Sequence, residues 1–201
     1  MKVVIPLAGF GTRLRPHTYT KPKPLIPVAG KAVLGHILDK LVGMEIEEII
    51  FIVGYLGDQI RDYVESFYDF PARFVEQQEL KGQAHAIHLA KEHMSGPVLI
   101  IFVDTIFETD VSVLSQEPSD GVIYVKEVKD PRRFGVVIAE KGFITKLVEK
   151  PSTPVSNLAV IGLYYIKDSQ VLCYSCPWEI DRCKEFCGPI SRKNRWLVTS
   201  A

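Results

Sequence analysis

Short apolar segments separated by amphipathic stretches are the feature that most constrains the fold of this chain. Strand-like runs recur at residues 2–7, 48–53, 72–76 and 97–103. Residues 98–103 read Val-Leu-Ile-Ile-Phe-Val, with no polar residue to mark a solvent-facing side. Such a strand is buried on both faces, as in a parallel sheet that helices cover on both sides.

Helical patterns lie between these runs, at residues 32–42, 56–67 and 83–93. In the first of them, Leu34, Leu38 and Leu41 recur at helical spacing. Strands that alternate with helices of about 11 residues indicate βαβ units. The sequence therefore predicts an α/β fold, a Rossmann-like three-layer α/β/α sandwich with a mixed, mainly parallel sheet.

The pattern changes after Asp104. Strand-like segments at residues 121–128, 134–139, 143–148 and 158–166 follow one another through short connections. They predict an antiparallel extension of the sheet that forms a second wall of a site. Ligands of open α/β sheets bind beyond the carboxyl ends of the strands, and the segments after Leu7 and Val75, together with Asp104, fall at such ends.

The first strand runs into a glycine-containing turn, Ala8-Gly9-Phe10-Gly11-Thr12-Arg13, and a second basic cluster follows at residues 21–25. Glycine permits a sharp turn and close approach of a ligand to the backbone. Free amides in such a turn form an anion-binding concavity, and arginine and lysine match phosphate oxygens. We therefore predict a polyphosphate site here.

The distribution of charge favours a small anionic ligand. The first 40 residues carry seven Lys or Arg against one acid, a net charge of +6, whereas the whole chain is neutral. A nucleic-acid binder is more often basic overall. A basic surface loop without a ligand is the alternative, and we favour the phosphate site.

Length and composition fit one globular domain with an appendage. The chain has 201 residues, and 47% of them are hydrophobic, which is ordinary for a globular protein. No apolar run approaches the ~20 residues needed to span a bilayer, and the first residues lack a signal-peptide layout. We expect a cytoplasmic protein with neither a membrane nor a nucleic acid as partner.

Two common phosphate-binding motifs are missing. No Gly-x-x-x-x-Gly-Lys-Ser/Thr string occurs, and the third glycine of the dinucleotide fingerprint is replaced by Leu14. P-loop kinases and NAD enzymes are therefore disfavoured.

A more specific resemblance rests on residues 7–16, Leu-Ala-Gly-Phe-Gly-Thr-Arg-Leu-Arg-Pro, and residues 21–27, Lys-Pro-Lys-Pro-Leu-Ile-Pro. These strings resemble the signature of the sugar-1-phosphate nucleotidyltransferases, the family of glucose-1-phosphate thymidylyltransferase and UDP-glucose pyrophosphorylase. The resemblance covers about residues 1–168. Later matches follow in the family's order: Gln77 with Gly82-Gln83-Ala84, Asp104, Glu149-Lys150-Pro151, and Asn157 with Gly162-Leu163-Tyr164.

The resemblance implies transfer of a nucleotidyl group from an NTP to a sugar-1-phosphate, with release of pyrophosphate. It assigns catalysis to Arg13, which would grip the leaving phosphates, and to Lys23, which would neutralise the α-phosphate. Gln77 would read a pyrimidine edge, because its amide offers both a donor and an acceptor. The implied nucleotide-binding residues are Leu7, Ala8, Gly9, Gly11, Thr12, Gln77 and Gly82.

Asp104 is the predicted ligand of Mg²⁺, which prefers a carboxylate or two plus substrate phosphates; an aspartate that caps a helix is the alternative. By resemblance, Lys150 would bind the sugar phosphate, and Glu149 and Asn157 would accept bonds from sugar hydroxyls. The alternative for these three residues is a solvated turn.

The favoured substrates are dTTP or UTP with glucose-1-phosphate, while a guanylyl or cytidylyl transfer stays open. A domain that binds nucleotide or nucleotide-sugar with little or no turnover is the rival from another class. Family members are often oligomers, so a homo-oligomer stays open too.

Two histidines and four cysteines lie close enough in the sequence for a zinc site to be considered. His85 and His88 lie three residues apart on one predicted helix, but neither has a partner in a zinc pattern. The cysteines cluster at Cys173, Cys176, Cys183 and Cys187, with spacings shorter than those of usual zinc modules. We favour ordinary side chains over a zinc site in both places.

The chain loses its periodicity from about residue 169, where the resemblance also stops. We therefore predict a catalytic domain at residues 1–168 and an atypical tail at residues 169–201, with no regular pattern over 173–201. Related enzymes continue with further helices, a strand and a second metal-binding aspartate. Our hypothesis is an out-of-frame or divergent ending that leaves the domain incomplete, which a comparison of the coding DNA in its other two frames would test.

Overall fold

The computed structural model describes residues 1–170, 172 and 196–200. Its described part is built on a nine-stranded mixed sheet with the order β5-β4-β1-β6-β10-β7-β11-β9-β8. The strands are β1 (Lys2–Pro6), β4 (Glu48–Val53), β5 (Ala72–Glu76), β6 (Val98–Ile101), β7 (Gly121–Glu127), β8 (Gly135–Glu140), β9 (Phe143–Glu149), β10 (Leu158–Ile166) and β11 (Trp196–Ser200). A separate hairpin pairs β2 (Pro27–Val28) with β3 (Lys31–Ala32).

The helices are short and lie between the first strands. They are α1 (Val33–Asp39), α2 (Gly57–Phe67) and α3 (Gln83–Leu89). Turns of 3₁₀ helix occur at Thr12–Leu14, His17–Tyr19, Lys23–Leu25, Lys91–His93 and Ser112–Gln116. Within the described ranges, no helix is both long and apolar enough to cross a bilayer.

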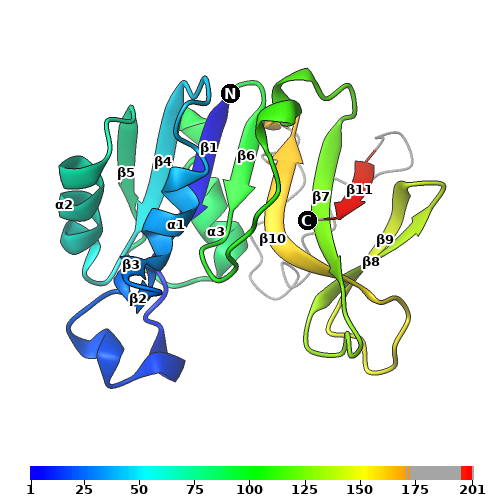
Figure 1. Cartoon of the computed structure of the whole chain (residues 1–201), viewed down its shortest axis with the longest axis horizontal. Coiled ribbons are helices and arrows are strands. Elements are labelled where there is room, and N and C mark those ends of the chain that lie inside the picture. The colour runs from blue at the N-terminus through cyan, green and yellow to red at the C-terminus, as the bar shows by residue number, and fades with distance from the viewer. Residues whose placement is uncertain (171, 173–195, 201) are drawn as a thin grey trace.

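The sheet separates two apolar layers, because successive side chains of a strand point to opposite faces. On one face, Val3 and Ile5 of β1 pack in a cluster with residues of α1 and α2, such as Leu34. On the other face, Val4 belongs to a cluster with Ile87 of α3. Figure 1 shows α1 in front of the sheet and α3 behind it. The predicted three-layer α/β/α architecture is confirmed.

The two halves of the sheet differ in strand direction. The neighbours β5, β4, β1 and β6 run parallel, whereas β10 runs antiparallel to β6 and β7, and β8 runs antiparallel to β9. The antiparallel extension predicted after Asp104 is therefore confirmed.

The tail contributes a strand that the sequence pattern did not predict. Residues Trp196–Ser200 form β11, which runs parallel to β7 and pairs with β9. The sequence over 173–201 shows neither helical nor alternating patterning, yet these five residues form a strand. Five residues are too few to establish a period, and long-range pairing decides whether such a segment becomes a strand.

Candidate functional site

Two adjoining cavities open at the carboxyl ends of the parallel strands. We call the first, of about 570 Å³, the glycine-loop cavity, because residues 6–9 and 11–14 line it. We call the second, of about 680 Å³, the strand cavity, because β7, β8, β9 and β10 line much of it. Gln83, Phe102 and Asp104 line both cavities and form a shared wall.

The glycine-loop cavity gathers the residues that the sequence assigns to a nucleotide. Segments from β1, from the 3₁₀ turn Lys23–Leu25, and from the loops after β5 and β6 meet there, although they are far apart in the sequence. Ten predicted residues line it: Leu7, Ala8, Gly9, Gly11, Thr12, Arg13, Lys23, Gln77, Gly82 and Asp104.

The backbone at Gly11 explains why the loop needs glycine. Gly11 has φ 61°, in the left-handed region, and a Cβ there would lie 2.9 Å from Thr18 Cγ2 and 3.0 Å from Lys23 Cβ. The buried Thr18 Oγ1 donates a hydrogen bond to the Gly11 carbonyl at 3.0 Å. Thr18 thus fixes the loop beside Lys23, and no sequence motif predicted this role.

Gln77 lines this cavity, and its side chain is held by two contacts. Its side chain is buried, and its Nε2 donates to the Gly82 carbonyl at 3.3 Å and lies 2.9 Å from Nδ1 of His85. These contacts occupy the amide nitrogen. The sequence pointed to Gln77 but not to His85, the partner that orients it.

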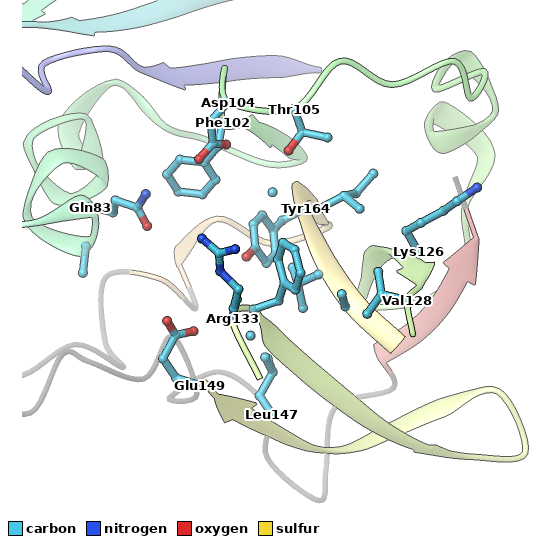
Figure 2. A pocket seen from close by; sticks show the side chains of 17 residues that line it. Gln83, Phe102, Asp104, Thr105, Lys126, Val128, Arg133, Leu147, Glu149 and Tyr164 are labelled. Carbon is cyan, nitrogen blue, oxygen red and sulfur yellow. The ribbon is translucent and has the colours of Figure 1, made fainter. Parts of the chain in front are cut away.

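The strand cavity combines apolar walls with charged side chains (Figure 2). Figure 2 shows the guanidinium of Arg133 pointing into the space between Asp104 and Glu149, with the Tyr164 hydroxyl beside it. Glu149 was predicted, whereas Arg133 was missed. The sequence offered one signal for Arg133, namely its position one residue before the strand-like segment 134–139.

Two glycines shape the strand cavity. A Cβ on Gly135 would lie 2.8 Å from Glu149 Oε2, so the carboxylate packs over the bare backbone of the neighbouring strand. Gly162 has φ 79°, and its carbonyl accepts from the Phe102 amide at 2.8 Å at an irregularity in β10. A Cβ there would lie 3.0 Å from Phe102 Cβ, so glycine lets Phe102 form the shared wall.

Asp104 is an exposed carboxylate that borders both cavities. It does not cap a helix, because the next helical turn begins at Ser112. Among the described residues, no group of three His, Cys, Asp or Glu side chains is arranged to hold a metal. A hard carboxylate between two ligand cavities nevertheless suits Mg²⁺, which draws most of its other ligands from water and substrate phosphates.

Two predicted residues do not line either cavity. Lys150 is exposed, and its Nζ lies 3.2 Å from Glu149 Oε1. Asn157 is exposed, and its carbonyl accepts from the Val128 amide at 2.9 Å. The four clustered cysteines lie outside the described residues.

The arrangement suits two anionic ligands held side by side. Arg13 and Lys23 bring positive charge to the glycine-loop cavity, and Arg133 brings it to the strand cavity. Asp104 stands at the border, where reacting groups of two ligands would meet.

Comparison with known proteins identifies relatives over most of the chain. A family model described as nucleotidyl transferase matches residues 2–193. The bifunctional protein GlmU of Methanocaldococcus jannaschii is 40% identical over 166 residues, which are 82% of this chain and 39% of the relative. The UTP–glucose-1-phosphate uridylyltransferase AglF of Haloferax volcanii is 34% identical over 172 residues, with 82% of this chain and 71% of the relative covered. The chain therefore spans about two fifths of the length of the GlmU relative.

The fold also matches a solved structure. The UDP-glucose pyrophosphorylase of Acinetobacter baumannii superposes with a TM-score of 0.83 at 19% sequence identity. The match covers 99% of this chain and 85% of the solved one. At this identity the likeness speaks for the fold alone, and it agrees with the α/β/α architecture.

Proposed function

This chain belongs to the nucleotidyl transferase family, and we propose that it joins an NTP to a sugar-1-phosphate. The observation that carries the proposal is the pair of adjoining cavities with Asp104 in their shared wall. A reaction between two phosphorylated substrates requires them side by side, with the attacking oxygen near the phosphorus.

In the proposed reaction, a phosphate oxygen of the sugar-1-phosphate attacks the α-phosphorus of the NTP. The bond between the α-phosphorus and the bridging oxygen breaks, and pyrophosphate leaves with the bond's electron pair. Lys23 neutralises the α-phosphate, and Arg13 binds the leaving phosphates with its planar guanidinium. The backbone of Gly9 and Gly11 lines the path of the phosphates.

The divalent cation of the proposal is Mg²⁺, with Asp104 as its protein ligand. When bound, it would neutralise charge on the substrate phosphates. The exposed carboxylate of Asp104 at the border of both cavities fits that role.

The strand cavity is the proposed place for the sugar. Glu149 lines it and would accept bonds from sugar hydroxyls. Lys150 and Asn157 stay predictions from the family resemblance. They require side-chain movement, because they line neither cavity in this conformation.

For the nucleotide we propose UTP or dTTP, and for the sugar glucose-1-phosphate. The oxygen of the Gln77 amide is the acceptor offered to a pyrimidine edge, since its nitrogen bonds Gly82 and contacts His85. The AglF relative is a UTP–glucose-1-phosphate uridylyltransferase, which supports this choice. We also propose a cytoplasmic enzyme, with residues 1–168 as catalytic domain and residues 169–201 as a tail.

A pyrophosphate-release assay tests the proposal. The protein is incubated with Mg²⁺, each of the NTPs, and glucose-1-phosphate, N-acetylglucosamine-1-phosphate or mannose-1-phosphate. We expect release with UTP or dTTP that depends on the sugar phosphate. Nucleotide binding without release would instead favour the binding domain without turnover, and absence of nucleotide binding would overturn both.

A further inference from the structure

Arg133 is a charged residue of the strand cavity that the proposed reaction does not use. We infer that its guanidinium binds the phosphate group of the sugar-1-phosphate and thereby sets the preference of this cavity for phosphorylated sugars. The inference rests on the proposed function, because it assigns a contact to one of the two substrates.

The Arg133 side chain points into the strand cavity. Two cationic side chains, Lys126 and Arg133, line the strand cavity. In Figure 2, the Lys126 ammonium points away from the other charged groups, whereas the Arg133 guanidinium points toward the space between Asp104 and Glu149. Arg133 is therefore the lining cation that a ligand at the Asp104 border would meet.

The neighbouring residue, Arg132, is held by a carboxylate outside the cavities, in contrast to Arg133. Arg132 is engaged by Asp130, whose two oxygens accept from Arg132 Nε at 2.9 Å and Nη2 at 2.8 Å. Arg132 lines neither cavity. Two adjacent arginines thus have separate tasks, since one closes a surface turn and the other enters the cavity.

The backbone around Arg133 is fixed from both sides. The Phe134 amide donates to the Pro131 carbonyl at 3.0 Å, which closes the turn, and the Lys150 amide donates to the Phe134 carbonyl at 3.1 Å. Arg133 therefore projects from a turn tied to both β8 and the end of β9, rather than from a loose loop.

The charges that line the strand cavity also favour a cationic contact for the sugar phosphate. The cavity presents the carboxylates of Asp104 and Glu149, which repel a sugar phosphate unless a cation compensates for them. Lys150 pairs with Glu149 and lies outside the lining. The guanidinium has the planar fork that binds phosphate oxygens in pairs, so Arg133 adds positive charge where a sugar phosphate would meet these carboxylates.

The test compares Arg133→Gln and Arg133→Lys with Arg132→Gln, the matched control. The first measurement is calorimetric titration of each protein with the three sugar-1-phosphates named above, which requires no turnover. We expect Arg133→Gln to lose affinity by about 10- to 100-fold, the range for loss of a charged hydrogen-bond donor. Arg133→Lys should recover part of the affinity, and Arg132→Gln should bind like the unaltered protein.

The second measurement separates the two substrates kinetically. In the pyrophosphate assay, Arg133→Gln should raise KM for the sugar-1-phosphate and leave KM for the NTP within about twofold of the unaltered protein. A merely structural role would raise both KM values or lower the melting temperature. Glutamine at an exposed position changes little else.

Each outcome decides the inference. Equal losses in Arg133→Gln and Arg132→Gln, an unchanged affinity in Arg133→Gln, or no binding of any sugar-1-phosphate by the unaltered protein would overturn it. Arginine-dependent binding without pyrophosphate release from any NTP would uphold the inference while the proposed function fails. The two ideas are thereby tested apart.

Discussion

Lys23 is half-buried beside the glycine turn, and a Cβ on Gly11 would lie only 3.0 Å from its Cβ. If it neutralises charge that shifts at the α-phosphate, Lys23→Ala should lower kcat by about 100- to 1,000-fold, as for loss of one preorganised donor. NTP affinity should change far less, because Arg13 and the backbone remain. Steady-state kinetics and nucleotide titration measure the two effects.

Lys21→Ala is the control for this prediction. Lys21 is exposed and lines neither cavity, yet it lies only two residues away and carries the same charge. A comparable loss of kcat in both variants would point to the general field of the basic segment rather than to a contact of Lys23.

Gly135 sets the position of the Glu149 carboxylate. In Gly135→Ala, the new methyl group would meet Glu149 Oε2 at 2.8 Å, and the exposed carboxylate would move aside at little cost in stability. We expect KM for the sugar-1-phosphate to rise about threefold or more, with a melting temperature near that of the unaltered protein, since the neighbour that shifts is a flexible side-chain end. A large fall in melting temperature would show that backbone packing matters more.

The residues of the glycine-loop cavity were predictable because they belong to contiguous motifs. Gly11, Arg13 and Lys23 lie in the two strings, residues 7–16 and 21–27, that resemble a family signature. Arg133 was not, because its direction depends on Asp130 engaging Arg132 and on the pairing of β8 with β9. Lys150 follows Glu149 directly in the sequence, but no local pattern reveals that only Glu149 lines the strand cavity.

At the scale of elements, α3 makes the stability of the fold depend on pH. Burial lowers the pKa of His88 from 6.5 to about 4, with Lys91 and His85 adding to the effect. The folded state therefore keeps His88 neutral where the unfolded chain accepts a proton. Stability should be fully present above pH 6.5 and fall as the pH drops from 6.5 toward 4.

Denaturant unfolding at pH 7.5 and pH 5 measures this dependence. His88→Gln should flatten it, because the half-buried imidazole that resists protonation is gone. His17→Gln is the control, since His17 is exposed on a different element. An unchanged slope in His88→Gln would assign the pH response to other groups.

Strands were the most predictable elements, and three of them have the predicted bounds. The bounds of β4 and β10, inside the sheet, agree with the sequence ranges 48–53 and 158–166, and those of the edge strand β5 agree with 72–76. Helix ends were less certain: α1 ends at Asp39 instead of residue 42, and α3 ends at Leu89, followed by a separate 3₁₀ turn. Only tertiary contacts decide whether the last turn stays α-helical.

For the whole molecule, β11 joins the tail to the antiparallel half. Trp196 is buried and stands opposite Gly121 of β7. A Cβ on Gly121 would lie 2.6 Å from Trp196 Cε3, so Gly121→Val should force the indole out. We expect a red-shifted Trp196 emission and a free energy of unfolding lower by about 1–3 kcal/mol.

Trp178→Phe provides the background for this experiment, because Trp196 is then the only tryptophan in the chain. Glu127→Ala, at the exposed end of β7, serves as the control. An unchanged emission maximum in Gly121→Val would mean that Trp196 of β11 does not pack against β7 in solution.

The wall shared by the cavities has a consequence for how such proteins diversify. Apart from Gln83, Phe102 and Asp104, the linings have no residue in common. The glycine-loop cavity is lined mainly by the first third of the chain, and the strand cavity is lined mainly by residues beyond 120. Preferences for base and for sugar can then drift separately, and chimeras cut after Asp104 should inherit the base of one parent and the sugar of the other.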